Sequence, residues 1–171
     1  MQLARFLNSV FKKDGFILED ANSKSYIIGN PKKNDPIKLK ILNNHLLSLA
    51  TSKDNFPYSA NCYYVYNKDK NCLIFSSDPH TNHAKQFIKN NNVAATIAID
   101  NNDYMQIKGV QLLGKIQPIK LDDLKSATQR YLAKYPYAKD FPLHLWFFEI
   151  NFIKMVDNNL GFGKNIVWKK D

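Results

Sequence analysis

Arginine is scarce in this chain, and long apolar runs are missing altogether. Of 24 basic residues, only Arg5 and Arg130 are arginine. Arginine is the usual bidentate reader of phosphates and guanines, and the lysines are dispersed, so the net charge of +9 does not predict nucleic-acid binding. A positive net charge suits the attraction of a small phosphorylated ligand.

No run approaches the roughly 18 apolar residues of a membrane helix, and Asn8 and Ser9 interrupt the N-terminal segment where a secretory signal would be apolar. We expect a cytoplasmic protein without a membrane span.

Cysteine is also rare, and paired catalytic groups are missing. Cys62 and Cys72 form no CxxC, and no histidine lies at a ligand-like interval from them, so no metal site is predicted. We expect two buried thiols in neighbouring strands without a disulfide, because a cytoplasmic compartment is reducing. Glu149 and Asp157 are isolated carboxylates, which argues against a paired acid and base.

What is present is a series of short strand-like segments separated by polar turns. The chain has 171 residues, 44% of them hydrophobic, which suits one domain with a short appendage. Strands are expected over residues 46–51, 58–66, 72–77, 93–100 and 165–168. Residues 106–119 and 146–156 each read as one long strand or as a pair of strands. Helices are expected from Asp78 to about Lys89, with Asp78 as N-cap and Pro79 in first position, and over 121–135. Because consecutive antiparallel strands need edge closure, this order predicts a β-dominated α+β domain built as a barrel or half-barrel.

The first 36 residues have a different character. Apolar residues recur at helical spacing over residues 1–13, which predicts an amphipathic helix. Residues 15–20 and 24–29 read as a hairpin, and residues 30–36 as a polar, proline-flanked linker. We therefore divide the chain into an appendage over 1–36 and a main domain over 37–171.

The segment 74–85 carries the strongest signal for a binding site. A strand ends in hydroxyl residues, a helix opens directly after it, and further polar residues fill its first turns. These are Ser76, Ser77, Thr81, Asn82 and His83. A helix N-terminus offers free N–H groups to anions, and hydroxyl and imidazole groups add donors. The pattern indicates a phosphate cradle with His83 at the surface. The alternative is an ordinary capped surface helix with solvated side chains.

Five motifs in order carry a resemblance to a known family. They are LSLATS (47–52), SANCYY (59–64), TNHA (81–84), IKGVQLLG (107–114) and DNNLGFGK (157–164). From Leu46 onward the chain resembles the FMN-binding split-barrel superfamily of pyridoxamine 5'-phosphate oxidase, closest to a small uncharacterised bacterial branch. The resemblance implies a six-stranded antiparallel split barrel with two or three helices, which binds FMN between the subunits of a homodimer.

The same resemblance implies roles for individual residues. The flavin ring would lie along the strand that holds Ser59 and Asn61. The phosphate would meet the end of the next strand and the helix start, at Ser76, Ser77, Thr81, Asn82 and His83. The second subunit would contribute Lys108 and Gln111, and Lys164 of the last motif is a further cofactor-binding candidate.

Two departures from the family and one further likeness refine this picture. The oxidases offer an Arg-Lys pair to the phosphate where this chain has Asn82-His83, which removes fixed positive charge. Their arginine-containing C-terminal substrate motif has no counterpart here, which argues against pyridoxamine phosphate oxidation. Residues 1–41 resemble the leading segment of cyclopropane-fatty-acid-synthase-type methyltransferases but lack the Gly-rich loop that binds the methyl donor.

The expected function is that of an FMN-dependent oxidoreductase of unknown substrate. The flavin itself carries the redox chemistry, so no side chain is obliged to act as acid or base. Catalytic residues are therefore not assigned, and a flavin carrier without turnover fits the same motifs. The alternative is a non-catalytic binding protein for FMN, a deazaflavin or haem.

Overall fold

The structure is a computed structural model that describes residues 14–19, 25–29, 44–98, 102–103, 108–158 and 165–170. The helix expected over residues 1–13, the linker over 30–36 and the candidate Lys164 lie outside these ranges. Among the described residues, no helix is long and apolar enough to cross a membrane.

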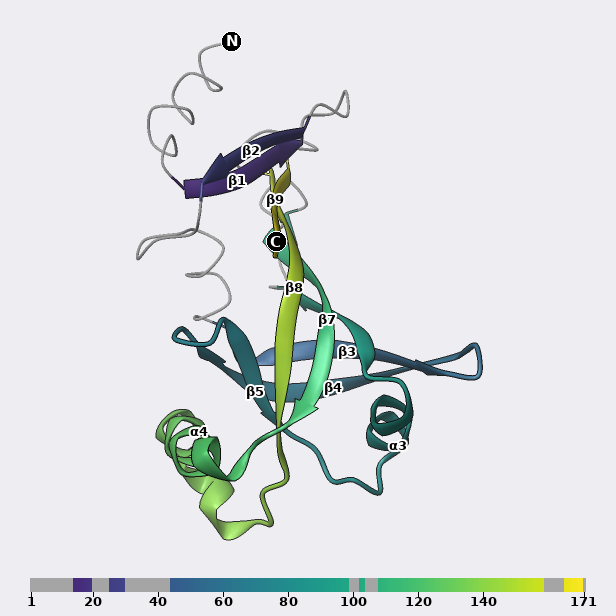
Figure 1. Ribbon diagram of the computed structural model, residues 1–171, viewed down its shortest axis with the longest axis vertical. Coiled ribbons are helices and arrows are strands. Elements are labelled where there is room, and N and C mark those ends of the chain that lie inside the picture. The colour runs from purple at the N-terminus through teal and green to yellow at the C-terminus, as the bar shows by residue number, and fades with distance from the viewer. Residues whose placement is uncertain are drawn as a thin grey trace.

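Six antiparallel strands form a closed barrel (Figure 1). They are β3 (Leu46–Lys53), β4 (Phe56–Asn67), β5 (Cys72–Ser76), β6 (Asn92–Ala98), β7 (Lys108–Pro118) and β8 (Leu145–Asp157). Their order is β8-β5-β4-β3-β6-β7, and β7 pairs back onto β8. Along β3 the inward residues Leu47 and Leu49 are buried while their neighbours are exposed, as the two-residue period of a strand requires. The β-dominated barrel predicted from the sequence is confirmed.

Three further strands extend the sheet from one edge of β8. The last of them in sequence, β9 (Asn165–Lys169), pairs with β8, and β1 (Asp14–Glu19) pairs with β9. The strand β2 (Ser25–Gly29) completes an antiparallel hairpin with β1, which confirms the expected hairpin. The N-terminal hairpin thus meets the main domain through β9, and the division at residue 36 stays a prediction.

The helix α4 (Leu121–Lys134) covers the outer face of the barrel over β4, β5 and β8. A short 3-10 helix, η2 (Pro136–Asp140), follows it. The Lys134 ammonium donates to the carbonyl oxygens of Asn44 (2.6 Å) and Tyr64 (3.1 Å), and the Tyr135 hydroxyl donates to Tyr64 O at 2.6 Å. These bonds tie the end of α4 to the barrel wall.

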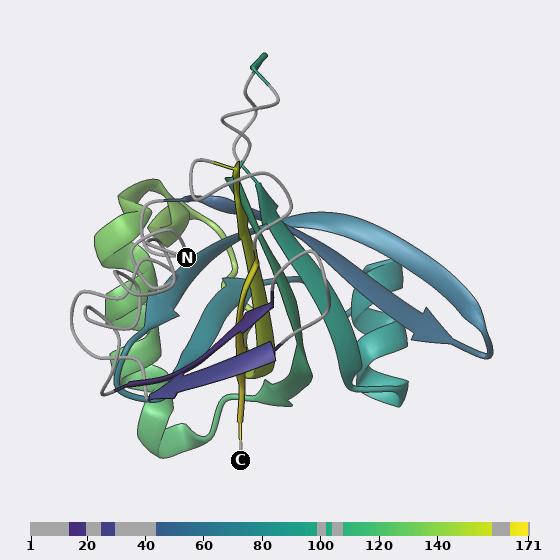
Figure 2. The ribbon, with the colours of Figure 1, turned by 90° about the horizontal axis from the view of Figure 1, so that it is seen from above.

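The β3–β4 hairpin forms an arm that runs out beyond the barrel (Figure 2). We expected a turn over residues 52–57, but the turn is only Asp54 and Asn55, whose φ angles are 53° and 60°. Two consecutive positive φ angles match the tight hairpin turns that suit the twist of flanking strands. The helix α3 (Asn82–Lys89) packs against this arm, where Asn90 Nδ2 donates to Ser52 O at 2.9 Å.

One of the two glycines in β7 marks a close approach of another strand. The pairing of β7 with β8 shifts register between Leu113 and Gly114. A Cβ added at Gly114 would lie 2.0 Å from Glu149 O, whereas one at Gly109 would find its nearest neighbour at 3.6 Å. The expectation that a strand glycine marks a bulge or close approach is confirmed at Gly114 alone.

Candidate phosphate-binding site

The start of α3 differs from the sequence-based expectation. The helix begins at Asn82, and its N-cap is Thr81, whose hydroxyl accepts from Ala84 N at 3.4 Å. The Asp78 carboxylate instead accepts from His80 N at 2.7 Å within the preceding turn. The prediction of Asp78 as N-cap was therefore wrong, because a short carboxylate can satisfy a nearby turn N–H as well as a helix terminus.

Three predicted side chains meet directly before and within the first turn of α3. The Ser77 hydroxyl lies 2.7 Å from His83 Nε2, and the Thr81 hydroxyl lies 3.3 Å from each of them. Ser77 is only 7% exposed. Its backbone is held on both sides, because Ser77 N donates to His144 O and Trp146 Nε1 donates to Ser77 O, each at 2.9 Å. We call Ser77, Thr81 and His83 the cradle.

His83 is half-buried, so the expectation that it lies at the surface was wrong. Its ring stands between those of Tyr58 and Phe87, with centroid distances of 6.5 and 6.3 Å. Burial lowers the pKa of His83 below its usual range. The imidazole is therefore neutral at neutral pH, with one nitrogen as donor and the other as acceptor.

The donor set suits an anionic oxygen. The backbone N–H groups of Asn82 and His83 have no acceptor in the described part of the chain, and helix N-terminal N–H groups favour phosphate. A nucleophilic reading of the Ser77–His83 pair is less suitable. Within the described ranges, no carboxylate orients the imidazole of His83, as an activated serine nucleophile requires.

Beside the cradle, β4 has an unpaired edge. Residues 64–67 of β4 pair with β5, whereas residues 56–63 pair only with β3. The chain that follows β5 leads directly into Ser77. Phe56 O accepts from Gln86 Nε2 at 3.3 Å, and the edge nearer to Ser77 is open to a ligand whose phosphate lies in the cradle.

The structure separates Ser59 and Asn61 from the cradle. Side chains alternate along β4, so these two lie on the face opposite to Tyr58, the residue that stacks on His83. Across the strands, the register aligns Asn61, Ser48, Thr96 and Gln111 in one exposed row. The hydroxyl of Ser48 donates to Asn61 Oδ1 at 2.8 Å.

The remaining predicted residues are placed as follows. Ser76 is the last residue of β5, Asn82 is exposed at the start of α3, and Lys108 opens β7. Sequence reasoning missed Tyr58, Ser48 and Thr96. The period-2 alternation of the strands was the signal that could have found them, but it needs the cross-strand register that only the structure supplies.

Both cysteines are buried and free, in the neighbouring strands β4 and β5, as expected. Burial raises the pKa of Cys62 to about 11 and that of Cys72 to about 12. Both thiols are protonated at neutral pH, so neither is an activated nucleophile.

Comparisons with known proteins agree with the barrel. No protein-family profile matches the chain. A UPF0306 protein of Photorhabdus laumondii is 36% identical over 126 residues, which cover 74% of this chain and 88% of that protein. Among solved structures, a heme binding protein from Mycobacterium smegmatis has a TM-score of 0.66 at 15% identity, over 76% of this chain and 55% of that one. An FAD-binding protein from Mesorhizobium loti has a TM-score of 0.58 at 15% identity, over 78% and 92% of the two chains. At these identities, the two structures show a shared fold.

Proposed function

The chain belongs to the UPF0306 family, and we propose that it is a flavin-binding protein that holds FMN by its phosphate in the cradle. The observation that carries the proposal is the convergence of Ser77, Thr81 and His83 on the first turn of α3, beside the unpaired edge of β4. One structural neighbour is named as a heme binding protein from M. smegmatis, and another as an FAD-binding protein from M. loti. These names support a cofactor-binding use of the same fold.

The cradle fits a phosphate although it holds no fixed cation. Two helix N–H groups and the Ser77–His83 pair can donate to phosphate oxygens, whereas the Thr81 hydroxyl donates to Asp78 O at 2.8 Å and positions the helix start. The cluster is also held in place before a ligand arrives, because Ser77 is anchored through its backbone to His144 and Trp146. Preorganised donors lower the entropic cost of binding.

When bound, FMN would supply hydride or single-electron transfer, and the chain would supply its binding and orientation. We therefore propose a flavin-dependent oxidoreductase, with a flavin carrier as the non-catalytic variant. A cytoplasmic location is part of this proposal.

We further propose that the flavin site is completed by a second copy of the chain. The outer face of β3, β4, β6 and β7 is exposed, and it combines the polar row with apolar side chains. These are Leu46, Tyr63 and Leu113, which are 42%, 51% and 51% exposed. A sheet face of this kind is costly in water unless it is covered. A partner lying on it would bring Gln111 to the interface, whereas Lys108, three residues earlier in β7, alternates onto the opposite face.

The absorption spectrum of the freshly purified protein tests the proposal before any assay. A flavin that co-purifies, or that is taken up on addition of FMN, gives the flavin absorption bands, and chromatography of the released chromophore identifies it as FMN. A Soret band would instead support the haem alternative. A protein that stays colourless and takes up no FMN would overturn the proposed function.

A further inference from the structure

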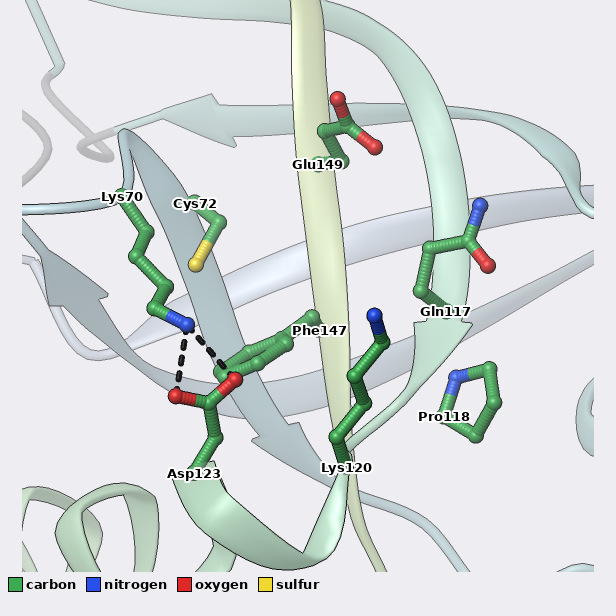
Figure 3. A pocket seen from close by; sticks show the side chains of 8 residues that line it. All are labelled: Lys70, Cys72, Gln117, Pro118, Lys120, Asp123, Phe147 and Glu149. Atoms are coloured by element: carbon green, nitrogen blue, oxygen red, sulfur yellow. Dashed lines mark hydrogen bonds and ion pairs between the residues drawn. The ribbon is translucent and has the colours of Figure 1, made fainter.

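A pocket of about 480 Å³ lies on the outer face of the barrel, where β5, β7 and β8 meet the start of α4 (Figure 3). It begins at Cys72, the first residue of β5, whereas the cradle follows Ser76, the last. Four residues of strand separate the two positions by about 13 Å. The pocket is therefore distinct from the proposed flavin site.

Ion pairs neutralise both acidic groups of the pocket. The Lys70 ammonium lies 2.6 Å from each carboxylate oxygen of Asp123, and Lys170 pairs with Glu149. Lys120 also lines the pocket, and no carboxylate pairs with it among the residues that the structure describes. Figure 3 shows its ammonium extending between Phe147 and Gln117. The four charged lining residues sum to zero, but Lys170 pairs with Glu149 from outside the lining, which leaves the positive charge of Lys120 without a partner.

The remaining lining is apolar and flat, with one amide. The ring of Phe147, the ring of Pro118 and the buried thiol of Cys72 form the apolar part. The amide of Gln117 has no hydrogen-bond partner in the described ranges, and it offers both donors and an acceptor. The volume lies within the range of small-molecule sites, roughly 300 to 1,000 Å³.

We propose that this pocket binds a small aromatic monocarboxylate. Its carboxylate would pair with Lys120, its ring would lie against Phe147 and Pro118, and a polar ring substituent would meet Gln117. A second acidic group on the ligand would find no second unpaired lysine in the described lining, because Lys70 already pairs with Asp123, so a single negative charge is preferred. The inference does not depend on flavin binding, because none of these residues belongs to the cradle.

The test uses 2-naphthoate as probe, with 2-naphthamide as its neutral isostere and acetate as the anion without a ring. Titrations followed by backbone amide NMR shifts report both the affinity and the place of binding. We expect shifts centred on Gln117, Lys120 and Phe147, and an affinity for naphthoate about tenfold or more above that for either control compound. Lys120→Glu should weaken naphthoate binding by at least about tenfold.

The matched control is Lys125→Glu, at an exposed lysine that does not line the pocket and belongs to α4, the helix that Lys120 precedes as N-cap. It makes the same change in net charge and should leave naphthoate affinity within about twofold. Equal weakening by both variants would overturn the proposal, since it would show only attraction to a chain of net charge +9. Equal affinity for naphthoate and naphthamide, or no saturable binding up to about 10 mM, would also overturn it. A thermal melt of each variant checks its folding, which is expected to hold because both lysines are exposed.

Discussion

Replacement of His83 by alanine separates the two roles that the structure gives to this side chain. In the free protein, the change removes the 2.7 Å bond to Ser77 and the ring contacts with Tyr58 and Phe87. A hydrogen bond contributes about 0.5–1.5 kcal/mol net, and Ser77 keeps the Thr81 hydroxyl at 3.3 Å. We expect a loss of about 1–2 kcal/mol in the free energy of unfolding, or roughly 2–8 °C in the melting temperature.

In the flavin complex, the same change removes one donor to the phosphate. A hydrogen bond to a charged group is worth about 1.5–3 kcal/mol, so FMN affinity should fall by about tenfold to a hundredfold. Lys89→Ala is the control, because Lys89 lies at the far end of α3 and is exposed. It should leave FMN affinity unchanged.

Fluorescence quenching titrations with FMN and urea unfolding of the free protein measure the two effects on the same variants. Lower stability with unchanged FMN affinity would refute the cradle and leave His83 a packing residue only.

The pH dependence of the free energy of unfolding adds a second check. The folded-state pKa of His83 lies below the unfolded value near 6.5, so its contribution to stability is present above pH 6.5 and is lost as the pH falls towards the folded pKa. His83→Gln should therefore reduce the loss of stability that occurs as the pH falls below 6.5.

Three further predictions address the fold and the assembly. Gly114→Ala should lower the free energy of unfolding by more than about 3 kcal/mol or prevent soluble expression, whereas Gly109→Ala should lower it by less than about 1 kcal/mol. Denaturant unfolding compares the two variants, and equal stabilities would refute the close approach at Gly114. In solution, light scattering should give about twice the 19.8 kDa mass of one copy, and Leu113→Glu should shift the mass towards that of the monomer. A monomeric wild type at micromolar concentration would contradict the shared flavin site. The fragment 37–171 should retain the barrel, although it loses the hairpin that pairs with β9. Circular dichroism and gel filtration check this, and an insoluble or molten fragment would show that residues 1–36 are part of the core.

The strands and the β-dominated architecture could be predicted because each strand has local signals. A compact apolar run over 46–51 and a polar turn over 67–71 suffice to predict the meander of β3, β4 and β5. The pairing of β6 with β3 and of β8 with β5 joins segments far apart in sequence, so the full strand order could not be predicted. The length of the β3–β4 arm could not be predicted in this way. Its turn is Asp54-Asn55, which lacks the glycine that usually marks two positive φ angles, so the whole polar stretch from Ser52 to Pro57 reads as loop.

The candidate site was predictable as far as its members are neighbours in the chain. Ser77, Thr81 and His83 lie within seven residues, so one helix start brings them together. The burial of His83 was not predictable, because it comes from Tyr58, which reaches it only through the β3–β4 arm. The pocket at Lys120 was missed for the same reason, since β5, β7, β8 and α4 form it from segments far apart in sequence.

The central claim is that the cradle recognises the flavin phosphate. The most direct measurement compares the affinities of the wild-type protein for FMN and for riboflavin, which has the same ring and ribityl chain but no phosphate. The account predicts that FMN binds at least about tenfold more tightly, and that the ratio of the two affinities falls towards one when Ser77 and His83 are both replaced by alanine. Equal affinities of the wild-type protein for FMN and riboflavin would contradict it.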